Sequence, residues 1–299
     1  MLHKEAVGQK GYSHTPHRKA IIMRLQLLLA LLPLSNFVFE VRGAASSSHF
    51  IDEALRHRAS EHTATTTDEA SPSTDHFARR SGTRAHVLRD GQGFNNVDAL
   101  FVVNLKHRDD RRKDIDAMFT SLGVTKHKFV TAVPTDCGYI GSSLSHAMAV
   151  AECVHLKYAT CAVFEDDFSL QVDAQAANRA LDEFFFSGPA DWDVALLSGS
   201  FVRTEKSPYP FVEKVLQAFH TSGYLINGAY APMLLENFME SAYMVNSNCT
   251  VGAGINPIVL DAHWQILQPQ GNWFGFHPKI GKQQASFSDI AGSLMDWNL

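Results

Sequence analysis

The stretch Cys161-Ala162-Val163-Phe164-Glu165-Asp166-Asp167 decides the fold prediction for this chain. Four apolar residues run directly into three carboxylates, a pattern typical of a strand that is covered on both faces and ends at a polar edge. Carboxylates beside a hydrophobic core are costly unless a cation or water compensates their charge. We therefore expect a buried strand over residues 161–164 and a polar site where it ends.

Segments of two kinds alternate around this strand. Short apolar runs predict further strands over residues 100–105, 128–133, 193–197 and 223–226. Helical patterns cover residues 108–122, 143–158 and 233–239, and Gly123 is a plausible stop for the first. This alternation predicts an α/β fold, a Rossmann-type domain with a mostly parallel central sheet. In such sheets ligands bind outside the carboxyl ends of the strands.

Glu165 and Asp167 are two positions apart, so they project to the same side if the chain stays extended. They can then share a hard divalent cation, which prefers oxygen ligands and leaves positions open for phosphate oxygens. A solvated turn or the start of a helix is the alternative interpretation of the triplet. Its place at a strand end favours the metal site.

Two further clusters have less specific chemistry. Arg108, Arg111 and their neighbours follow the first strand, and arginines that open a helix suit a diphosphate, although a solvated helix start explains them as well. The stretch 261–290 combines aromatic residues with Gly, His and Gln, which predicts a loop-rich wall rather than regular elements. Within it, Asp261 is a candidate general base and His277 a candidate metal ligand.

The first 95 residues differ from the rest in composition. Residues 1–20 form a basic tail, and the apolar run within residues 21–42 predicts a signal anchor or a cleaved signal peptide. Residues 43–95 are rich in Ser, Thr and Ala and predict a disordered stem or linker. Both interpretations of the apolar run place a folded domain, residues 96–299, in the lumen of the endoplasmic reticulum or Golgi. The protein is then a single-pass type II membrane protein, or secreted if the segment is cleaved.

Composition narrows the class of protein. An apolar share of 45% and a charged share of 19% exclude a wholly disordered or collagen-like chain. The net charge of −5 comes without a basic stripe, which argues against a nucleic-acid partner. The four cysteines show no CxxC spacing, which argues against structural zinc. In an oxidising lumen they can pair in three ways, with buried free thiols as the alternative, and Asn248-Cys249-Thr250 is a glycosylation sequon.

Four blocks in order resemble glycosyltransferase family 25, the group that contains lipooligosaccharide and procollagen galactosyltransferases. They are Val103-Asn104-Leu105 with Arg108 and Arg111, then Gly141-Ser142-Ser143-Leu144-Ser145-His146, then Phe164-Glu165-Asp166-Asp167, and finally Gln283 with Ser286-Phe287-Ser288-Asp289-Ile290. These are similar to the family's INL-x-R-x-x-R, G-C-x-x-SH, LEDD and Q-x-S-x-SDI blocks. Ser142 departs from the pattern, because it stands where the family usually has Cys.

The resemblance implies a GT-A-like fold, a nucleotide-sugar donor such as UDP-galactose, a Mn²⁺ or Mg²⁺ ion and inversion at the anomeric carbon. It implies that Asp167 is a metal ligand together with Glu165, while Glu165 or Asp166 meets the ribose or the ion. The remaining implied donor contacts are Asn104, Arg108 and Arg111 on the nucleotide side, and Ser145 and His146 near the donor. Asp261 falls where the family places a late acid, the candidate base.

The expected function is therefore the transfer of a hexose to a hydroxyl group of a glycan, glycoprotein or lipid acceptor. An uncleaved N-terminal anchor would add the membrane as a partner. Two alternatives stay open. One is a nucleotidyltransferase on a similar sheet, since acids at strand ends serve that chemistry too. The other is a non-catalytic luminal binding module that keeps the fold.

Overall fold

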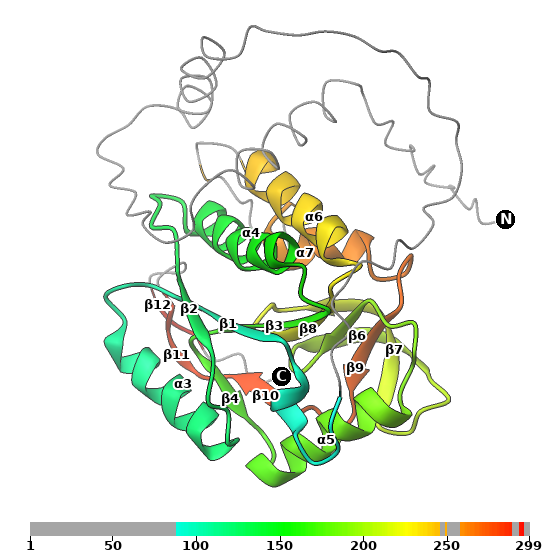
Figure 1. The fold of residues 1–299 in the computed structure, drawn as a ribbon. Helices are drawn as coiled ribbons and strands as arrows, with labels where there is room; N and C mark the ends of the chain where they lie inside the picture. The colour runs from blue at the N-terminus through cyan, green and yellow to red at the C-terminus, as the bar shows by residue number, and fades with distance from the viewer. Residues whose placement is uncertain (1–87, 246–248, 250–257, 289–292, 296–299) are drawn as a thin grey trace, which may run out of the picture.

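The computed structural model describes residues 88–245, 249, 258–288 and 293–295 of the chain (Figure 1). The predicted basic tail, the signal anchor or signal peptide and most of the predicted stem lie outside these residues, as does Asn248 of the sequon. Among the residues described, no helix combines the length and apolar character that crossing a bilayer requires.

The predicted strands and helices are present, and further elements lie between and after them. The strands are β1 (Ala99–Asn104), β2 (Lys128–Thr131), β3 (Thr160–Glu165), β4 (Phe168–Leu170), β5 (Val194–Leu196), β6 (Ser200–Lys206), β7 (Val212–Phe219), β8 (Gly223–Asn227), β9 (Trp273–Phe276), β10 (Gly281–Gln283), β11 (Ser286–Ser288) and β12 (Ser293–Met295). The helices are α3 (Asp109–Ser121), α4 (Gly138–Leu156), α5 (Ala174–Ser187), α6 (Ala231–Met244) and α7 (Leu260–His263), with the short 3-10 helices η1 (Gly93–Asn96) and η2 (Trp264–Ile266). The five predicted strands correspond to β1, β2, β3, β5 and β8, and the three predicted helices to α3, α4 and α6.

An eight-stranded sheet organises the domain, in the order β2-β1-β3-β8-β5-β9-β7-β6. The pairs β1–β2, β1–β3 and β5–β9 are parallel, and the other neighbouring pairs are antiparallel. Strands β8 and β7 therefore run against the other six. Because six of the eight strands run in the same direction, the expected mostly parallel sheet is confirmed. Most neighbouring pairs are nevertheless antiparallel, because each of the two reversed strands lies between strands of the other direction. Strands β4 and β10 form a separate antiparallel ladder beside the end of β3.

Helices cover the sheet on both faces, which gives a three-layer α/β arrangement (Figure 1). Helices α4, α6 and α7 lie on one face, and α3 and α5 lie on the other. Strand β3 shows why the sheet is buried on both sides: Cys161 and Val163 belong to the hydrophobic cluster under α4 and α6, while Ala162 and Phe164 belong to the cluster over α3 and α5. Successive side chains of a strand point to opposite faces, so an unbroken apolar run is required here.

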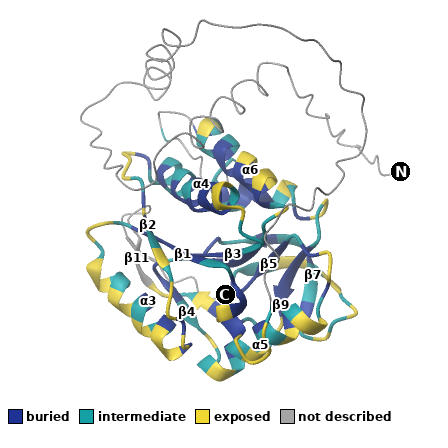
Figure 2. Cartoon of the chain, in the orientation of Figure 1, coloured by how far each residue is buried: buried dark blue, intermediate teal, exposed yellow. Residues whose placement is uncertain are grey.

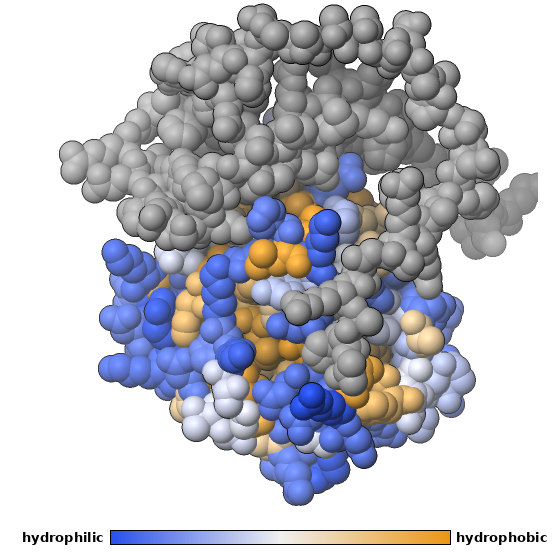
Figure 3. Space-filling model, in the orientation of Figure 1, coloured by the Kyte–Doolittle hydropathy of each residue, from blue (hydrophilic) through white to orange (hydrophobic). Residues whose placement is uncertain are grey.

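The burial pattern follows this layering. In Figure 2 the strands of the sheet are mostly buried, and exposed residues lie on the outward sides of α3, α5 and α6. Figure 3 shows hydrophilic residues along the outer surface at α3 and a band of hydrophobic residues through the middle of the same face. Helix α3 begins with Asp109 and Asp110, which suit a helix N-terminus, and the chain turns away at Gly123, whose φ is 70°.

Two predictions about these segments need correction. The stretch around residue 273 is not a loop-rich wall, because Trp273–Phe276 forms the buried strand β9 between β5 and β7. The ordered body also begins before residue 96: Phe94 is fully buried, and its backbone amide donates to Oδ1 of Asn178 on α5 at 3.1 Å. This buried side chain and the hydrogen bonds of Gly93 and Phe94 to α5 hold the end of a segment whose polar composition predicted a linker.

The four cysteines form two disulfides. Cys137 pairs with Cys249, 112 positions apart, and Cys153 pairs with Cys161, eight positions apart. The second bond ties the end of α4 to the start of β3. No free thiol is left among the cysteines described, so the alternative of buried free thiols does not apply.

Candidate functional site

The three carboxylates lie where β3 ends and β4 begins, at the edge of the sheet. Glu165 is the last residue of β3, while Asp166 and Asp167 form the turn that follows. Asp166 is 8% exposed and Asp167 is 7% exposed, so neither is a solvated turn residue. The structure thus confirms a polar cluster beside the core at the end of the predicted strand.

Asp166 is held by residues from the end of β1 and the first turn of α3. The Asn104 amide Nδ2 donates to Asp166 at 2.7 Å, and the Arg111 guanidinium donates to its other oxygen at 2.8 Å. Burial raises the pKa of Asp166 above its usual range, although Arg111 and Asn104 pull it down. Asp166 therefore anchors the first strand and helix to the cluster.

The basic cluster after β1 is consequently turned inward rather than open to a ligand. Arg111 contacts Asp166 and also lies 3.3 Å from Asp167, whereas Arg108 pairs with the exposed Asp110 at 2.9 Å. The structure brings Asn104 and Arg111 to the carboxylates, but pairs Arg108 elsewhere. That all three line a nucleotide stays a prediction, and in the structure Asn104 and Arg111 compensate a buried acid.

Glu165 is bound by two side chains, one from helix α4 and one from the segment before β8. Thr221 Oγ1 donates to Oε1 of Glu165 at 2.6 Å, and His146 Nε2 lies 3.3 Å from the same oxygen. His146 is 1% exposed, and its Nδ1 is 2.9 Å from the Tyr224 hydroxyl, so the ring is fixed at both nitrogens. Burial raises the pKa of Glu165, but His146 and Thr221 outweigh it and bring the pKa below its usual value. His146 is thus a positioning residue for Glu165.

Ser145, the other member of that sequence block, has a structural position. It is 1% exposed, and its hydroxyl accepts a hydrogen bond from the backbone amide of Val133 at 2.9 Å and donates to the carbonyl of Gly141. These bonds fix the connection between β2 and α4. The Ser145 hydroxyl is thus used inside the fold, and its place near a donor stays a prediction.

Asp167 has the most perturbed environment of the triplet. The side-chain amide of Gln283 on β10 donates to Oδ2 of Asp167 at 3.2 Å and is 3.4 Å from Oε2 of Glu165. Burial, and then the charge of Glu165, raise the pKa of Asp167 to about 7. Its Oδ1 is buried and has no hydrogen-bond partner among the described residues. Glu165 and Asp167 thus face one common group, as their spacing predicted.

The carboxylate cluster fits a divalent cation. Among the described residues, Arg111 is the one Arg or Lys side chain that forms an ion pair with these carboxylates. It contacts Asp166 and Asp167. A buried carboxylate oxygen without a partner is the atom that a cation would take. The described residues contain no group of three or more His, Cys, Asp or Glu side chains arranged to hold a metal. That does not conflict with such a site, since Mg²⁺-type ions are often held by one or two carboxylates with phosphates and waters.

Asp261 and His277, the two candidates from the late stretch, occupy different places. Asp261 lies in α7 and accepts a hydrogen bond from the backbone amide of His220 at 3.1 Å. Burial raises the pKa of Asp261, His220 lowers it, and the charge of Glu165 raises it further, which places Asp261 within electrostatic reach of the cluster. His277 is exposed beside an open hollow, and the structure describes no metal-holding group that includes it.

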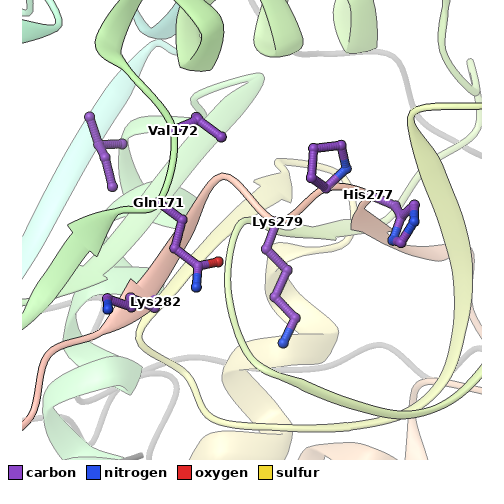
Figure 4. Close-up of a pocket in the computed structure, with 7 residues that line it drawn as sticks. Gln171, Val172, His277, Lys279 and Lys282 are labelled. Atoms are coloured by element: carbon purple, nitrogen blue, oxygen red, sulfur yellow. The ribbon is translucent and has the colours of Figure 1, made fainter. Parts of the chain in front are cut away.

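That hollow adjoins the carboxylate cluster. It measures about 710 Å³ and is lined by residues 170–172, residues 277–279 and Lys282 (Figure 4). Both of its walls connect to the cluster, since β4 follows Asp167 directly and β10 ends at Gln283.

Two contacts of the site were absent from the sequence predictions. Thr221 and His220 precede β8, and β8 runs antiparallel to β3, so the start of β8 lies at the edge where β3 ends. The direction of a strand cannot be read from its apolar run, so no site residue was predicted at the start of β8. His220 has a φ of 69°, which is rare for a residue with a Cβ and marks a constrained backbone.

Comparison with known proteins finds a partial relationship. Procollagen galactosyltransferase 1-A from Xenopus laevis is 26% identical over 173 aligned positions, which cover 47% of this chain and 28% of that protein. The chain thus spans under a third of that relative's length. No protein-family model matches the chain.

Two solved structures align with the chain at low TM-scores. A197 from STIV aligns with a TM-score of 0.31 and 10% identity, covering 60% of this chain and 80% of that one. Mannose-1-phosphate geranyltransferase from Thermus thermophilus aligns with a TM-score of 0.35 and 9% identity, covering 60% and 72%. At these TM-scores neither likeness decides the fold or the function. The partial sequence match supports a glycosyltransferase-like relationship for this chain.

Proposed function

We propose that this chain is a metal-assisted glycosyltransferase that moves a hexose from a nucleotide-diphosphate sugar to a hydroxyl group of a glycan, glycoprotein or lipid. The observation that carries the proposal is the cluster of three carboxylates at the end of β3, in which Asp167 keeps a buried oxygen without a partner among the described residues. The partial match to a galactosyltransferase supports it. The four blocks similar to glycosyltransferase family 25 favour UDP-galactose as the donor.

In this proposal Asp167 and Glu165 hold a Mn²⁺ or Mg²⁺ ion. Such an ion, when bound, stabilises the negative charge of a leaving diphosphate as a Lewis acid. Arg111 and Asn104 hold Asp166 in place, and His146 with Thr221 fixes Glu165. The ligands are therefore oriented before the donor arrives, which lowers the cost of binding.

Asp261 is the proposed general base. An acceptor hydroxyl has too high a pKa to attack readily at neutral pH, so a carboxylate within hydrogen-bond reach takes its proton as the new bond forms. Burial raises the pKa of Asp261, which suits a group that must accept a proton. One displacement of this kind inverts the anomeric centre, whereas retention requires a second displacement or a front-face route.

The proposed location is the lumen of the secretory pathway, in the endoplasmic reticulum or Golgi. Two disulfides among the described cysteines support it, because such bonds persist in oxidising compartments. The protein would be anchored in the membrane by residues 21–42, or released if that segment is cleaved.

A donor screen tests the proposed function. The full chain is incubated with MnCl₂ and a panel of UDP- and GDP-sugars, and release of the nucleoside diphosphate and of pyrophosphate is measured. We expect nucleoside diphosphate from one donor, faster with an acceptor present, and none in EDTA. Pyrophosphate release would instead favour the nucleotidyltransferase, and manganese-dependent UDP binding without turnover would favour the binding module.

Asp167→Asn provides the matched variant. It keeps the size of the side chain but removes the charge that holds the ion, so we expect turnover to fall below detection while the circular dichroism spectrum is retained. Asp114→Asn, at an exposed position of α3, removes the same charge away from the cluster and should leave turnover unchanged. Full turnover by Asp167→Asn would rule out the metal role.

A further inference from the structure

The diphosphate of a nucleotide sugar needs cationic partners, and Arg108 and Arg111, the two arginines expected to meet it, already have carboxylate partners. Arg111 lies 2.8 Å from Asp166 and 3.3 Å from Asp167. Arg108 pairs with Asp110 at 2.9 Å. Binding a diphosphate through these guanidiniums would break ion pairs, one of them nearly buried, and leave a carboxylate uncompensated. Cations outside these ion pairs are better partners.

The hollow beside the cluster carries further cations. Its lining includes Lys279, Lys282 and His277 and contains no acidic residue. In the view of Figure 4, the amide of Gln171 lies between the side chains of the two lysines. A volume of about 710 Å³ lies within the range of roughly 300–1,000 Å³ that is common for small-molecule sites.

A second, much smaller cavity shares both lysines with the hollow. It is also lined by His220, Ser222 and Gln283. Gln283 is the residue whose amide donates to Asp167 at 3.2 Å. Lys282 is its neighbour in the chain, so the hollow lies on the side of the carboxylate cluster that Gln283 contacts.

The two lysines differ in setting. Lys279 is partly buried, and its Nζ lies 5.2 Å from the centre of the Phe201 ring. Burial lowers the pKa of Lys279, so an adjacent anion would favour its charged form. Lys282 lies on β10 and is exposed, and the described residues provide no carboxylate within ion-pair distance of its Nζ.

We propose that Lys279 and Lys282 bind the diphosphate of the donor nucleotide, which occupies the hollow lined by residues 170–172 and 277–279. The inference rests on the proposed function and assigns the donor's anionic group to this side of the cluster in place of Arg108 and Arg111. Lysine ammonium groups bind phosphate as point charges. They would share the diphosphate charge with the ion held by Asp167.

Isothermal titration calorimetry of the full chain with UDP in MnCl₂ tests the inference. Lys282→Gln and Lys279→Gln should each weaken UDP binding by about tenfold, as expected for one charge-assisted contact. Lys282→Arg should restore most of it. Uridine, which lacks the diphosphate, should bind the wild type and both Gln variants equally. Lys126→Gln removes an exposed charge before β2, at the opposite ends of the strands, and should change UDP binding less than twofold.

The exposed Lys282 decides the test if Lys279→Gln fails to fold. Unchanged UDP binding in Lys282→Gln would overturn the inference. If this variant also raises the KM for the acceptor, the hollow would be assigned to an anionic acceptor. If the wild type turns over a UDP-sugar but binds UDP with the same affinity as Lys282→Gln, this inference is wrong and the proposed function still stands. A wild type that turns over no nucleotide sugar refutes the proposed function and the inference together.

Discussion

Arg111 donates to a carboxylate oxygen of Asp166 at 2.8 Å, and both side chains are nearly buried. This ion pair joins α3 to the turn after β3. Removing one partner of a buried pair is more costly than removing both, because it leaves a single uncompensated charge in the interior.

We therefore predict a strong coupling between these two residues. Arg111→Met should lower the free energy of unfolding by about 3 kcal/mol, whereas adding Asp166→Asn to Arg111→Met should restore part of the loss. Guanidinium unfolding of the wild type, the two single variants and the double variant measures this coupling. Losses that simply add, within about 0.5 kcal/mol, would show that the pair does not act as a unit.

Asp261 combines a structural bond with a proposed chemical role, and two substitutions separate them. Asp261→Asn keeps an oxygen that can accept from the His220 amide, so stability should change little, while kcat should fall by about 10²–10⁴-fold through loss of the base. Asp261→Ala should lose the same activity and also destabilise the fold, because the backbone of the left-handed His220 loses this hydrogen bond. Measurements of kcat and of thermal unfolding separate the two effects. Near wild-type kcat in Asp261→Asn would assign the residue a positioning role only.

Tyr230 should make the free energy of unfolding depend on pH in the alkaline range. Burial raises the pKa of Tyr230 to about 12 from its ordinary value of 10.0, and its hydroxyl accepts from Trp273 Nε1 at 3.3 Å. Above pH 10 the unfolded chain releases this proton and the folded chain retains it, so stability is lost as pH rises from about 10 to about 12.

Comparing Tyr230→Phe with the wild type isolates this contribution. Between about pH 9 and pH 11 the wild type should lose up to about 1 kcal/mol more than Tyr230→Phe, since solvent around a partly buried phenol reduces the full effect. Guanidinium unfolding at the two pH values provides the measurement. Equal losses in both proteins would show that Tyr230 titrates normally.

The two disulfides should differ in their effect on stability. In the chain-entropy model a bond that closes a longer loop restricts the unfolded chain more, so loss of Cys137–Cys249 should cost about 5 kcal/mol and loss of Cys153–Cys161 about 3 kcal/mol. Replacing each pair by Ala and following guanidinium unfolding tests the order. A larger loss for Cys153–Cys161 would indicate that its place between α4 and β3 matters more than loop length.

Local patterns predicted β1, β2, β3, α3 and α4, whereas β4 and α5 in the same part of the chain were not predicted. Strand β3 and its carboxylates could be read from the sequence because a strand buried on both faces requires an unbroken apolar run, and Phe164 and Val163 pack on opposite sides as this requires. The helix over α3 and its stop at Gly123 depend only on neighbouring residues, so they were predicted equally well.

The remaining elements depend on distant partners. Strand β6 is largely exposed and has no clear apolar alternation, so it was missed. Strand β9 contains Gly275, and Pro278 follows it closely. Both residues favour a loop, so this strand could not be predicted without its pairing with β5 and β7. The contacts of His146 with Glu165 and of Arg111 with Asp166 were not predicted for the same reason, since a sequence does not show which carboxylate a side chain faces.

Gln283 contacts Glu165 across 118 positions of sequence. A nascent chain that has already built β1, β3 and their covering helices still lacks the amide that steadies two of its acids. Premature termination between β9 and β10 would then yield a chain that retains much of the hydrophobic interior but lacks the amide beside Glu165 and Asp167. The carboxylate cluster is thus completed only when the last strands have been synthesised.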